Sequence, residues 1–366
     1  MSGRACLGCG AGVGEPFLDL GVQPLANAFV KPEDAARREP RFPLAVAYCA
    51  GCHLVQLTET APPEALFDEY LYFSSYSDDF VAHARAMAES LAERFRLGPG
   101  RGVLEVASND GYLLQFFQAR GVPVLGVEPA RNVAAVARAR GIPTLARFFG
   151  PDVVDQVLGE LLERTAFDTI YHEHVFYYSL AAVAGLAVRA GLEVFDVAPQ
   201  PVHGGSLRIF LQHPGARAVS PAVARLRADE AAAGLTGAAR YAGFAGAVDR
   251  LRGDLVSRLQ RLRADGRRLA AYGAPAKGTV LLNACGLGTD VLEFTVDRSP
   301  HKQGRLVPGV RLPIRPPEDL VKEMPDVTLL LPWNLVDEIV AQQAEYLRRG
   351  GAFLVPVPAP RLVRGG

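Results

Sequence analysis

Four polar side chains that could handle protons follow one another at Tyr171, His172, Glu173 and His174, between apolar neighbours. An imidazole can accept a proton near neutral pH, and an adjacent carboxylate can orient it or balance its charge. Burying such groups without partners costs free energy, so a core seldom contains them in a row. The stretch is therefore a candidate catalytic site, with a polar loop or part of a metal site as the alternatives.

Four of the five cysteines form two Cys-x-x-Cys pairs, Cys6 with Cys9 and Cys49 with Cys52. Two such pairs can place four thiolates tetrahedrally around zinc, and the metal would stabilise a Pro-rich segment that has little core of its own. Disulfides or a redox pair are the alternatives. Four protein ligands leave no open coordination position, so we expect a structural zinc that does not need the neighbouring His53.

Residues 101–150 have the pattern of a nucleotide-binding half-sheet. We expect strands at 102–107, 122–129 and 142–145, with helices after the first two. The tight turn at 108–111 and the acid Glu128 would then lie at the carboxyl edge of a parallel sheet, where Glu128 can accept hydrogen bonds from both ribose hydroxyls. No G-x-G-x-x-G is present, which favours S-adenosylmethionine over a dinucleotide. A sheet without a cofactor is the alternative.

A second pattern of this kind begins near residue 268. We expect strands at 269–272, 294–297, 327–333 and 352–356, with a Gly-bearing loop at 273–278. Helix-start amides together with Lys277 suit the diphosphate of a nucleotide sugar. The alternative is a structural sheet on which Lys277 is simply exposed. The segment 217–265 is rich in Ala, Arg and Leu and is expected to be helical, with its charges on a solvated face.

Two further segments could form ligand contacts. The cluster of tyrosines and serines at 70–79 precedes an expected helix at 79–95, and is either a lid of hydroxyls over a polar ligand or a packed loop. His203 precedes two glycines, so the backbone can approach a ligand closely there, or the segment is a bulge that leads into an edge strand.

The composition excludes some classes of function. The 366 residues carry 39 basic and 39 acidic side chains, which argues against a nucleic-acid-binding surface or a polybasic membrane-binding patch. No apolar run is long enough to span a bilayer, and the N-terminus lacks a hydrophobic signal core, so we expect a cytoplasmic protein. The sequence leaves the oligomeric state open, and a monomer is compatible with it.

These motifs together resemble the three-domain sugar C-methyltransferases, which act on nucleotide-linked deoxysugars in antibiotic pathways. The resemblance covers nearly the whole chain. It is carried by the four cysteines, Tyr70-x-Tyr72-Phe73-Ser74-Ser75-Tyr76-Ser77, Glu105-Val106-Ala107-Ser108-Asn109-Asp110-Gly111-Tyr112-Leu113-Leu114, Tyr171-His172-Glu173-His174, His203-Gly204-Gly205-Ser206-Leu207-Arg208, Tyr272-Gly273-Ala274-Pro275-Ala276-Lys277-Gly278 and Pro332-Trp333-Asn334.

The resemblance implies roles for the matching residues. His174 would be the base, with Glu173, Tyr171 and Tyr76 at the active site. The cofactor S-adenosylmethionine would be bound by the stretch that contains Glu105, Ser108, Asn109, Asp110, Gly111, Tyr112, Leu113, Glu128 and Pro129. The substrate, a nucleotide-linked deoxysugar that we expect to carry dTDP, would contact Tyr72, Ser75, His203 and Lys277.

The sequence therefore predicts an α/β protein with a zinc-binding module at 1–62, a class I methyltransferase Rossmann-like domain at 63–215 and a second Rossmann-like domain for the nucleotide sugar at 216–366. One departure from the family follows Leu158, where members usually continue through a further strand, helix and strand. Either 169–171 and 192–197 occupy the vacated strand positions, or the domain is incomplete and binds its cofactor poorly. The rival hypothesis is an impaired relative that binds nucleotide sugar or a pathway partner.

Overall fold

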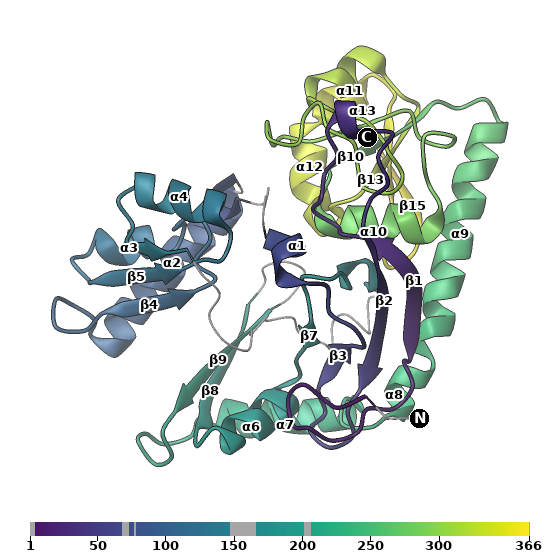
Figure 1. Ribbon diagram of the computed structural model, residues 1–366. Coiled ribbons are helices and arrows are strands. Elements are labelled where there is room, and N and C mark those ends of the chain that lie inside the picture. The colour runs from purple at the N-terminus through teal and green to yellow at the C-terminus, as the bar shows by residue number, and fades with distance from the viewer. Residues whose placement is uncertain (1–3, 68–72, 77, 147–165, 201–205, 366) are drawn as a thin grey trace. The chain divides into compact units, whose positions relative to one another are not determined.

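The computed structural model describes residues 4–67, 73–76, 78–146, 166–200 and 206–365. It is an α/β structure with two compact units, which we call the middle unit (61–153) and the larger unit (1–60 together with 154–366). Most of their helices and strands are labelled in Figure 1. The predicted α/β class is confirmed, whereas the division into three domains stays a prediction.

The middle unit is built on a parallel sheet with the strand order β4-β5-β6. Each expected strand of residues 101–150 is present in a shorter form, and helices connect the strands as predicted. The elements of this unit are α1 (Pro63–Phe67), η2 (Ser74–Tyr76), α2 (Asp78–Phe95), β4 (Val103–Val106), α3 (Leu114–Gln118), β5 (Val124–Val127), α4 (Arg131–Ala139) and β6 (Thr144–Leu145).

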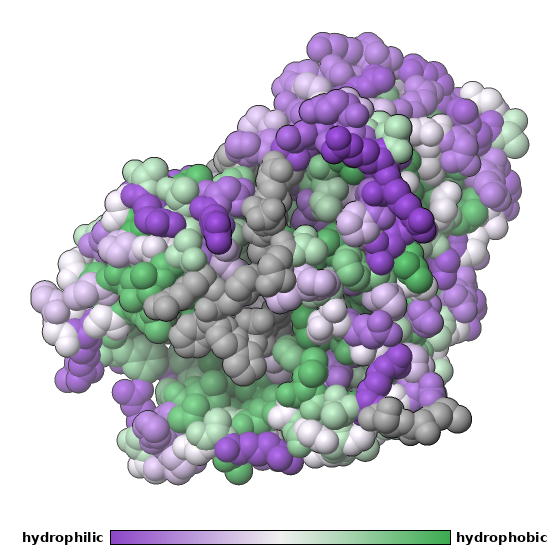
Figure 2. Space-filling view, viewed as in Figure 1, coloured by the Kyte–Doolittle hydropathy of each residue, from purple (hydrophilic) through white to green (hydrophobic). Residues whose placement is uncertain are grey.

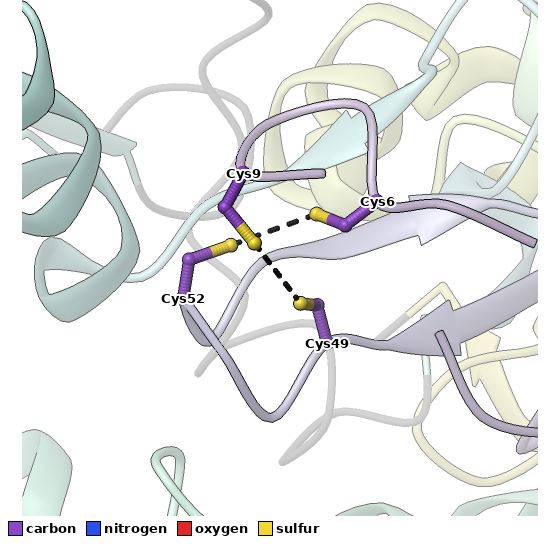
Figure 3. Close-up of side chains that lie close together, drawn as sticks. All are labelled: Cys6, Cys9, Cys49 and Cys52. Carbon is purple, nitrogen blue, oxygen red and sulfur yellow. Dashed lines mark hydrogen bonds between the residues drawn. The ribbon is translucent and has the colours of Figure 1, made fainter. Parts of the chain in front are cut away.

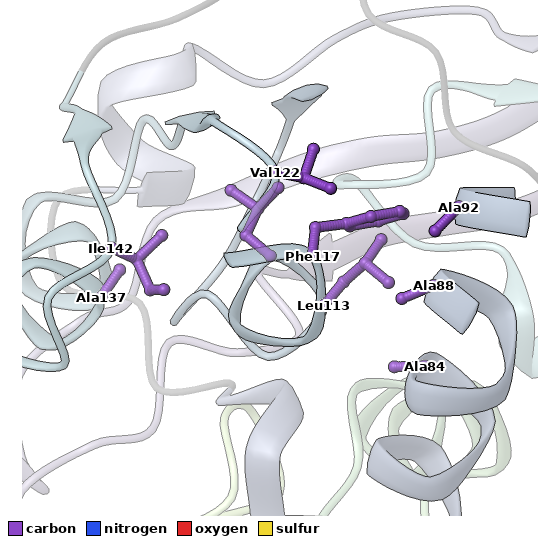
Figure 4. Packing of buried hydrophobic residues seen from close by; sticks show 9 residues of the cluster. Ala84, Ala88, Ala92, Leu113, Phe117, Val122, Ala137 and Ile142 are labelled. Carbon is purple, nitrogen blue, oxygen red and sulfur yellow. The ribbon is translucent and has the colours of Figure 1, made fainter. Parts of the chain in front are cut away.

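The core of the middle unit lies between α2, α3 and one face of this sheet. Ala84, Ala88 and Ala92 recur every four residues along α2 and therefore share one face of the helix. Their small side chains pack in the same cluster as Leu113 and Phe117 (Figure 4). Leu113, predicted to bind the cofactor, is therefore part of the hydrophobic core.

The second face of this sheet is less covered. Leu104 and Val106 alternate with residues that point to the core, and their side chains are 53% and 43% exposed. Among the described residues, no strand pairs with the outer edge of β4. The prediction that 169–171 and 192–197 fill vacated strand positions is wrong. Residues Phe167–Thr169 form the 3-10 turn η3, and β8 (Glu193–Gln200) pairs with β9 (Ser206–Gln212) in a separate sheet.

The larger unit contains an antiparallel sheet that joins two distant parts of the chain. Its order is β1 (Leu18–Pro24), β2 (Arg41–Tyr48), β3 (Val55–Leu57) and β7 (Phe176–Tyr177). Val55 pairs with Tyr177 and Gln56 with Phe176. The N-terminal cysteine module and the segment that follows His174 are therefore parts of one sheet.

The C-terminal part of the larger unit is a six-stranded sheet with the order β12-β11-β10-β13-β14-β15, parallel except for β15. The strands expected at 269–272, 294–297, 327–333 and 352–356 are confirmed as β10 (Leu269–Tyr272), β11 (Thr295–Val296), β13 (Val327–Leu330) and β14 (Ala352–Val355). The remaining strands are β12 (Ile314–Arg315) and β15 (Arg361–Arg364).

Helices account for most of the rest of the larger unit, including the segment 217–265 that was predicted to be helical. They are η1 (Pro32–Asp34), α6 (Leu180–Arg189), α7 (Pro221–Ala232), α8 (Ala239–Ala242), α9 (Phe244–Ala264), α10 (Ala276–Cys285), α11 (Glu318–Glu323), η5 (Trp333–Leu335), α12 (Val336–Gln342) and α13 (Ala344–Arg348).

The surface differs between these regions. Figure 2 shows hydrophobic residues at the surface around β4 and β5, whereas the surface over α11 to α13 is mostly hydrophilic. No helix in the described parts of the chain is both long and apolar enough to cross a bilayer.

Candidate active site

Tyr171 and His174 form a hydrogen-bonded pair on the loop between η3 and β7. The Tyr171 hydroxyl lies 2.5 Å from Nε2 of His174, and Nδ1 of His174 lies 3.0 Å from the carbonyl oxygen of Thr169. A carbonyl oxygen can only accept, so Nδ1 carries the hydrogen. In neutral His174 the lone pair is therefore on Nε2, where it accepts the Tyr171 hydroxyl.

Glu173 is buried beside this pair and has a different partner from the one predicted. Its Oε1 accepts a hydrogen bond of 2.9 Å from Nδ2 of Asn27, which follows β1 in the N-terminal module. Its Oε2 has no hydrogen-bond partner in the described parts of the chain. Burial raises the pKa of Glu173 to about 7, so its charge is sensitive to pH near neutrality.

His172 is not part of the hydrogen-bonded pair of Tyr171 and His174. It is fully buried, its ring lies edge-on against Phe42, and its Nε2 donates to the carbonyl oxygen of Phe42 at 3.2 Å. Burial lowers the pKa of His172, which favours the neutral ring. This histidine therefore holds the loop against β2.

Lys277 lies within the larger unit at the start of α10. Its Nζ is 4.3 Å from the centroid of the Trp333 ring and donates a hydrogen bond to Oδ1 of Asn334. Burial lowers the pKa of Lys277 to about 8, and the nearby charge of Asp168 opposes that shift. Its predicted contact with a diphosphate stays a prediction.

The four cysteines of the two Cys-x-x-Cys pairs come together as predicted (Figure 3). Their sulfur atoms lie within 4.8 Å of one another, and the Cys6–Cys52 and Cys9–Cys49 sulfur distances are both 3.6 Å. A disulfide would need about 2 Å. Four thiols at this spacing fit a tetrahedral zinc, whose Zn–S bonds of about 2.3 Å separate the sulfurs by a little under 4 Å.

The predicted cofactor turn is held by Glu128. Its two carboxylate oxygens accept hydrogen bonds of 2.9 Å from the backbone N–H groups of Asn109 and Ala130. Ala107, Asn109 and Gly111 all have positive φ, so the turn is unusually tight. A Cβ on Gly111 would lie 2.9 Å from the Ile142 side chain, which explains the glycine there.

Asp110 joins this turn to the serine-rich segment before α2. Its Oδ2 accepts hydrogen bonds from Ser75 Oγ at 2.5 Å and from Arg140 at 3.0 Å. Arg140 also donates to Ser75 Oγ at 3.0 Å, so the three residues form a closed network. Arg140 was not among the predicted site residues, and only the fold brings it to Asp110, 30 positions away.

β4 and the turn that follows it also contain buried oxygens that fit the expected cofactor. Oε2 of Glu105, Oγ of Ser108 and Oδ1 of Asp110 have no hydrogen-bond partner among the residues that the structure describes. Burial, reinforced by the charges of Glu128 and Asp110, raises the pKa of Glu105 to about 8. A carboxylate, a hydroxyl and a carboxyl group of this kind can hydrogen-bond the hydroxyl and ammonium groups of a ligand, as S-adenosylmethionine has.

The other predicted ligand residues have varied positions. Tyr112 stacks on Phe80 with ring centroids 4.9 Å apart, and Pro129 is half-buried after β5. Tyr76 ends η2, but its side chain, like Tyr72 and His203, lies outside the described residues. The predicted roles of these residues stay predictions.

Comparisons with known proteins identify the family. The chain is 35% identical to the C-methyltransferase NovU of Streptomyces niveus over 404 positions, which cover 98% of this chain and 96% of the relative. The chain belongs to this C-methyltransferase family. Residues 6–67 match the family described as a putative zinc binding domain, and residues 201–358 match the C-methyltransferase C-terminal domain. The family predicted from the motifs is thereby confirmed.

Family membership makes the chain an S-adenosylmethionine-dependent C-methyltransferase with a structural zinc. The alignment has 404 positions against 366 residues, so at least 38 positions, the difference between these numbers, have no counterpart in this chain. The chain is also similar to the crystal structure of magnesium protoporphyrin IX methyltransferase from Synechocystis PCC 6803 with bound SAM, at 12% identity and a TM-score of 0.27, over 39% of this chain and 85% of that one.

Proposed function

We propose that this enzyme methylates a carbon next to the ketone of a dTDP-linked 4-keto-6-deoxysugar, and that His174 is the base. The resemblance of the sequence motifs to sugar C-methyltransferases supports the substrate class. The observation that carries the proposal is the hydrogen bond from His174 Nδ1 to the Thr169 carbonyl, because it fixes the basic lone pair on Nε2 beside the Tyr171 hydroxyl.

The proposed chemistry starts with a proton transfer. Methylation at carbon needs a carbon nucleophile, and removal of a proton next to a ketone gives an enolate. Nε2 of His174 takes that proton, while the electron pair of the broken C–H bond moves onto the carbonyl oxygen. When bound, S-adenosylmethionine supplies the methyl group as an electrophile.

Tyr171 and the Thr169 carbonyl both assist this proton transfer. Nε2 has one lone pair, so the Tyr171 hydroxyl must release it before the proton transfer, and the hydroxyl can then donate to the carbonyl oxygen that becomes the enolate oxygen. The carbonyl of Thr169 continues to accept the Nδ1 hydrogen and stabilises the positive ring. Glu173, held by Asn27, adds a carboxylate whose ionisation would further favour the charged imidazole.

Solvent exchange at the substrate carbon tests the base directly. In D2O, without methyl transfer, the native enzyme should exchange the proton next to the ketone, which proton NMR follows. H174N should abolish the exchange. Y171F should slow it by about 100- to 1000-fold, because it removes one donor to the enolate but keeps the base. Unchanged exchange in H174N would exclude His174 as the base.

A product assay tests the substrate class. Incubation of the zinc-loaded enzyme with S-adenosylmethionine and a dTDP-linked 4-keto-6-deoxysugar should add the mass of one methylene to the sugar. The same sugar linked to UDP is tested at equal concentration, and the ratio of the two methylation rates measures how strongly the enzyme discriminates between the thymine and uracil nucleotides. Methylation of neither sugar, by an enzyme that binds S-adenosylmethionine in calorimetry, would reject the proposed substrate class.

A further inference from the structure

Asp168 and Trp333, which are buried, form with the half-buried Lys277 and Asn334 a group that we call the indole cluster. The indole Nε1–H of Trp333 donates to Oδ2 of Asp168 at 2.8 Å, and Lys277 Nζ lies over the face of the same ring at 4.3 Å from its centroid. Lys277 also donates to Asn334. A cation on the ring face and a carboxylate at the N–H edge both match the charge distribution of the indole.

The negative charge of the one carboxylate in the cluster is balanced by few neighbouring groups. Asp168 is fully buried, and its Oδ1 has no hydrogen-bond partner within the described ranges. Burial raises the pKa of Asp168 to about 6, and the nearby charge of Lys277 and the hydrogen bond from Trp333 oppose this shift by favouring the ionised form. A buried ion that loses its compensating partner is strongly destabilised, so Asp168 depends on two residues that are more than 100 positions away in the sequence.

Asp168 is also the central residue of η3, which ends at the residue whose carbonyl holds His174. The turn is closed by hydrogen bonds to the Ala166 carbonyl from the Thr169 amide at 3.1 Å and from the Thr169 hydroxyl at 2.6 Å. The Thr169 carbonyl then accepts from His174 Nδ1 at 3.0 Å. α10, which carries Lys277, packs against η3. A continuous set of contacts therefore runs from the C-terminal sheet to the imidazole.

We propose that Asp168 is a positioning residue for His174: anchored by Trp333 and Lys277, it fixes the η3 turn so that the Thr169 carbonyl holds His174 with its hydrogen on Nδ1. The proposal rests on the proposed role of His174 as the base. Trp333 and Lys277 would then orient the catalytic loop, in addition to the predicted contact of Lys277 with the substrate.

The test compares D168N with the native enzyme in two measurements. D168N keeps the shape of the side chain but removes the charge. The exchange rate at saturating sugar should fall about 10- to 100-fold, as misplaced supporting groups typically cause, while KM for the sugar changes less than about twofold. Nitrogen NMR of the histidine, assigned by comparison with H174N, should show that the hydrogen no longer resides mainly on Nδ1.

D326N is the matched control. Asp326 also accepts from an N–H group and pairs with an arginine in the C-terminal part, but none of its described contacts reaches η3. It should leave the tautomer and the exchange rate unchanged. Folding of each variant is checked by its zinc content and by circular dichroism, since W333F lacks the single tryptophan of the chain. If D168N does not fold, W333F, which removes the N–H donor but keeps an aromatic ring beside Lys277, decides the question by the same two measurements.

The outcomes separate this proposal from the proposed function. An unchanged His174 tautomer in a folded D168N or W333F variant would overturn the positioning role, whatever happens to the exchange rate. If H174N still exchanges the substrate proton, the assignment of the base fails, while a tautomer shift in D168N would still establish the coupling. A tautomer shift together with a reduced rate at nearly constant KM supports both.

Discussion

The first strands of two parallel sheets in this protein, β4 and β10, share a local sequence pattern but differ in how far they are buried. In both, a short apolar strand leads through a glycine-bearing turn into a helix. β10 lies between β11 and β13, and all four of its residues are buried. β4 pairs only with β5 among the described strands, and every second residue of it is exposed.

The comparison shows that apolar strand sequence does not by itself produce a buried strand. Val103–Val106 has the composition of a central parallel strand, which is normally covered on both sides. Its partners on one side are absent from the described sheet, and this chain has fewer residues than its relative over their shared length. We therefore expect the middle unit to tolerate changes on β4 that the C-terminal sheet does not tolerate on its central strands.

The largest expected difference between the units comes from the metal. Removal of zinc by a chelator, or C49S, should expose the cysteine module and loosen the β1-β2-β3-β7 sheet, because structural zinc contributes on the order of 10 kcal/mol to small modules. Hydrogen exchange followed by mass spectrometry should show lost protection in this sheet but not in α2 to β6. Equal loss in both units would contradict their independence.

A matched pair of leucines tests the comparison of the sheets themselves. Leu329 in β13 is fully buried, whereas Leu104 in β4 is 53% exposed. L329A should lower the free energy of unfolding by about 2–5 kcal/mol, since it leaves a cavity. L104A should change it by about 0.5 kcal/mol or less, as surface changes usually do. Denaturant titration measures both, and equal losses would show that β4 is covered in solution.

An effect that depends on pH is expected from the charge of Glu105 in β4, just before the cofactor turn. Its pKa rises from 4.5 to about 8 on folding, so the folded protein retains a proton that the unfolded chain releases. Stability should therefore decrease as pH rises through this interval. E105Q should melt like the native protein near the lower pKa and at a higher temperature near the upper one. A difference in melting temperature between E105Q and the native protein that stays constant across this pH interval would reject this explanation.

Local patterns in the sequence were sufficient for several features. The cysteine spacing predicted the four-sulfur cluster, because each pair needs only a short turn to bring its thiols together. The alternation of strands and helices predicted four of the six strands of the C-terminal sheet, with β10 at the expected positions, but it did not predict β12 or β15. The turn 108–111 and Glu128 were correctly expected to meet at a sheet edge, although Glu128 is already bound to two backbone amides.

Long-range contacts were not predictable in this way. Asn27 meets Glu173 across 146 positions, and Trp333 meets Asp168 across 165 positions. Neither pair has a spacing or periodicity that signals contact. Asn27 and Asp168 also have no chemical feature that separates them from ordinary loop residues until their burial and partners are known.

The sequence alone determined which residue types are available for chemistry: the four thiols, the Tyr171–His174 stretch and the acids of the cofactor turn. Short-range hydrogen bonds and side-chain periodicity act over a few residues, so such features can be recognised from the chain itself. Tertiary structure alone decided how these groups are used. The partner of Glu173 and the anchoring of Asp168 by Trp333 and Lys277 depend on burial and on contacts between distant segments. The tautomer of His174 depends on a local hydrogen bond to Thr169, which forms only in the folded path of this loop.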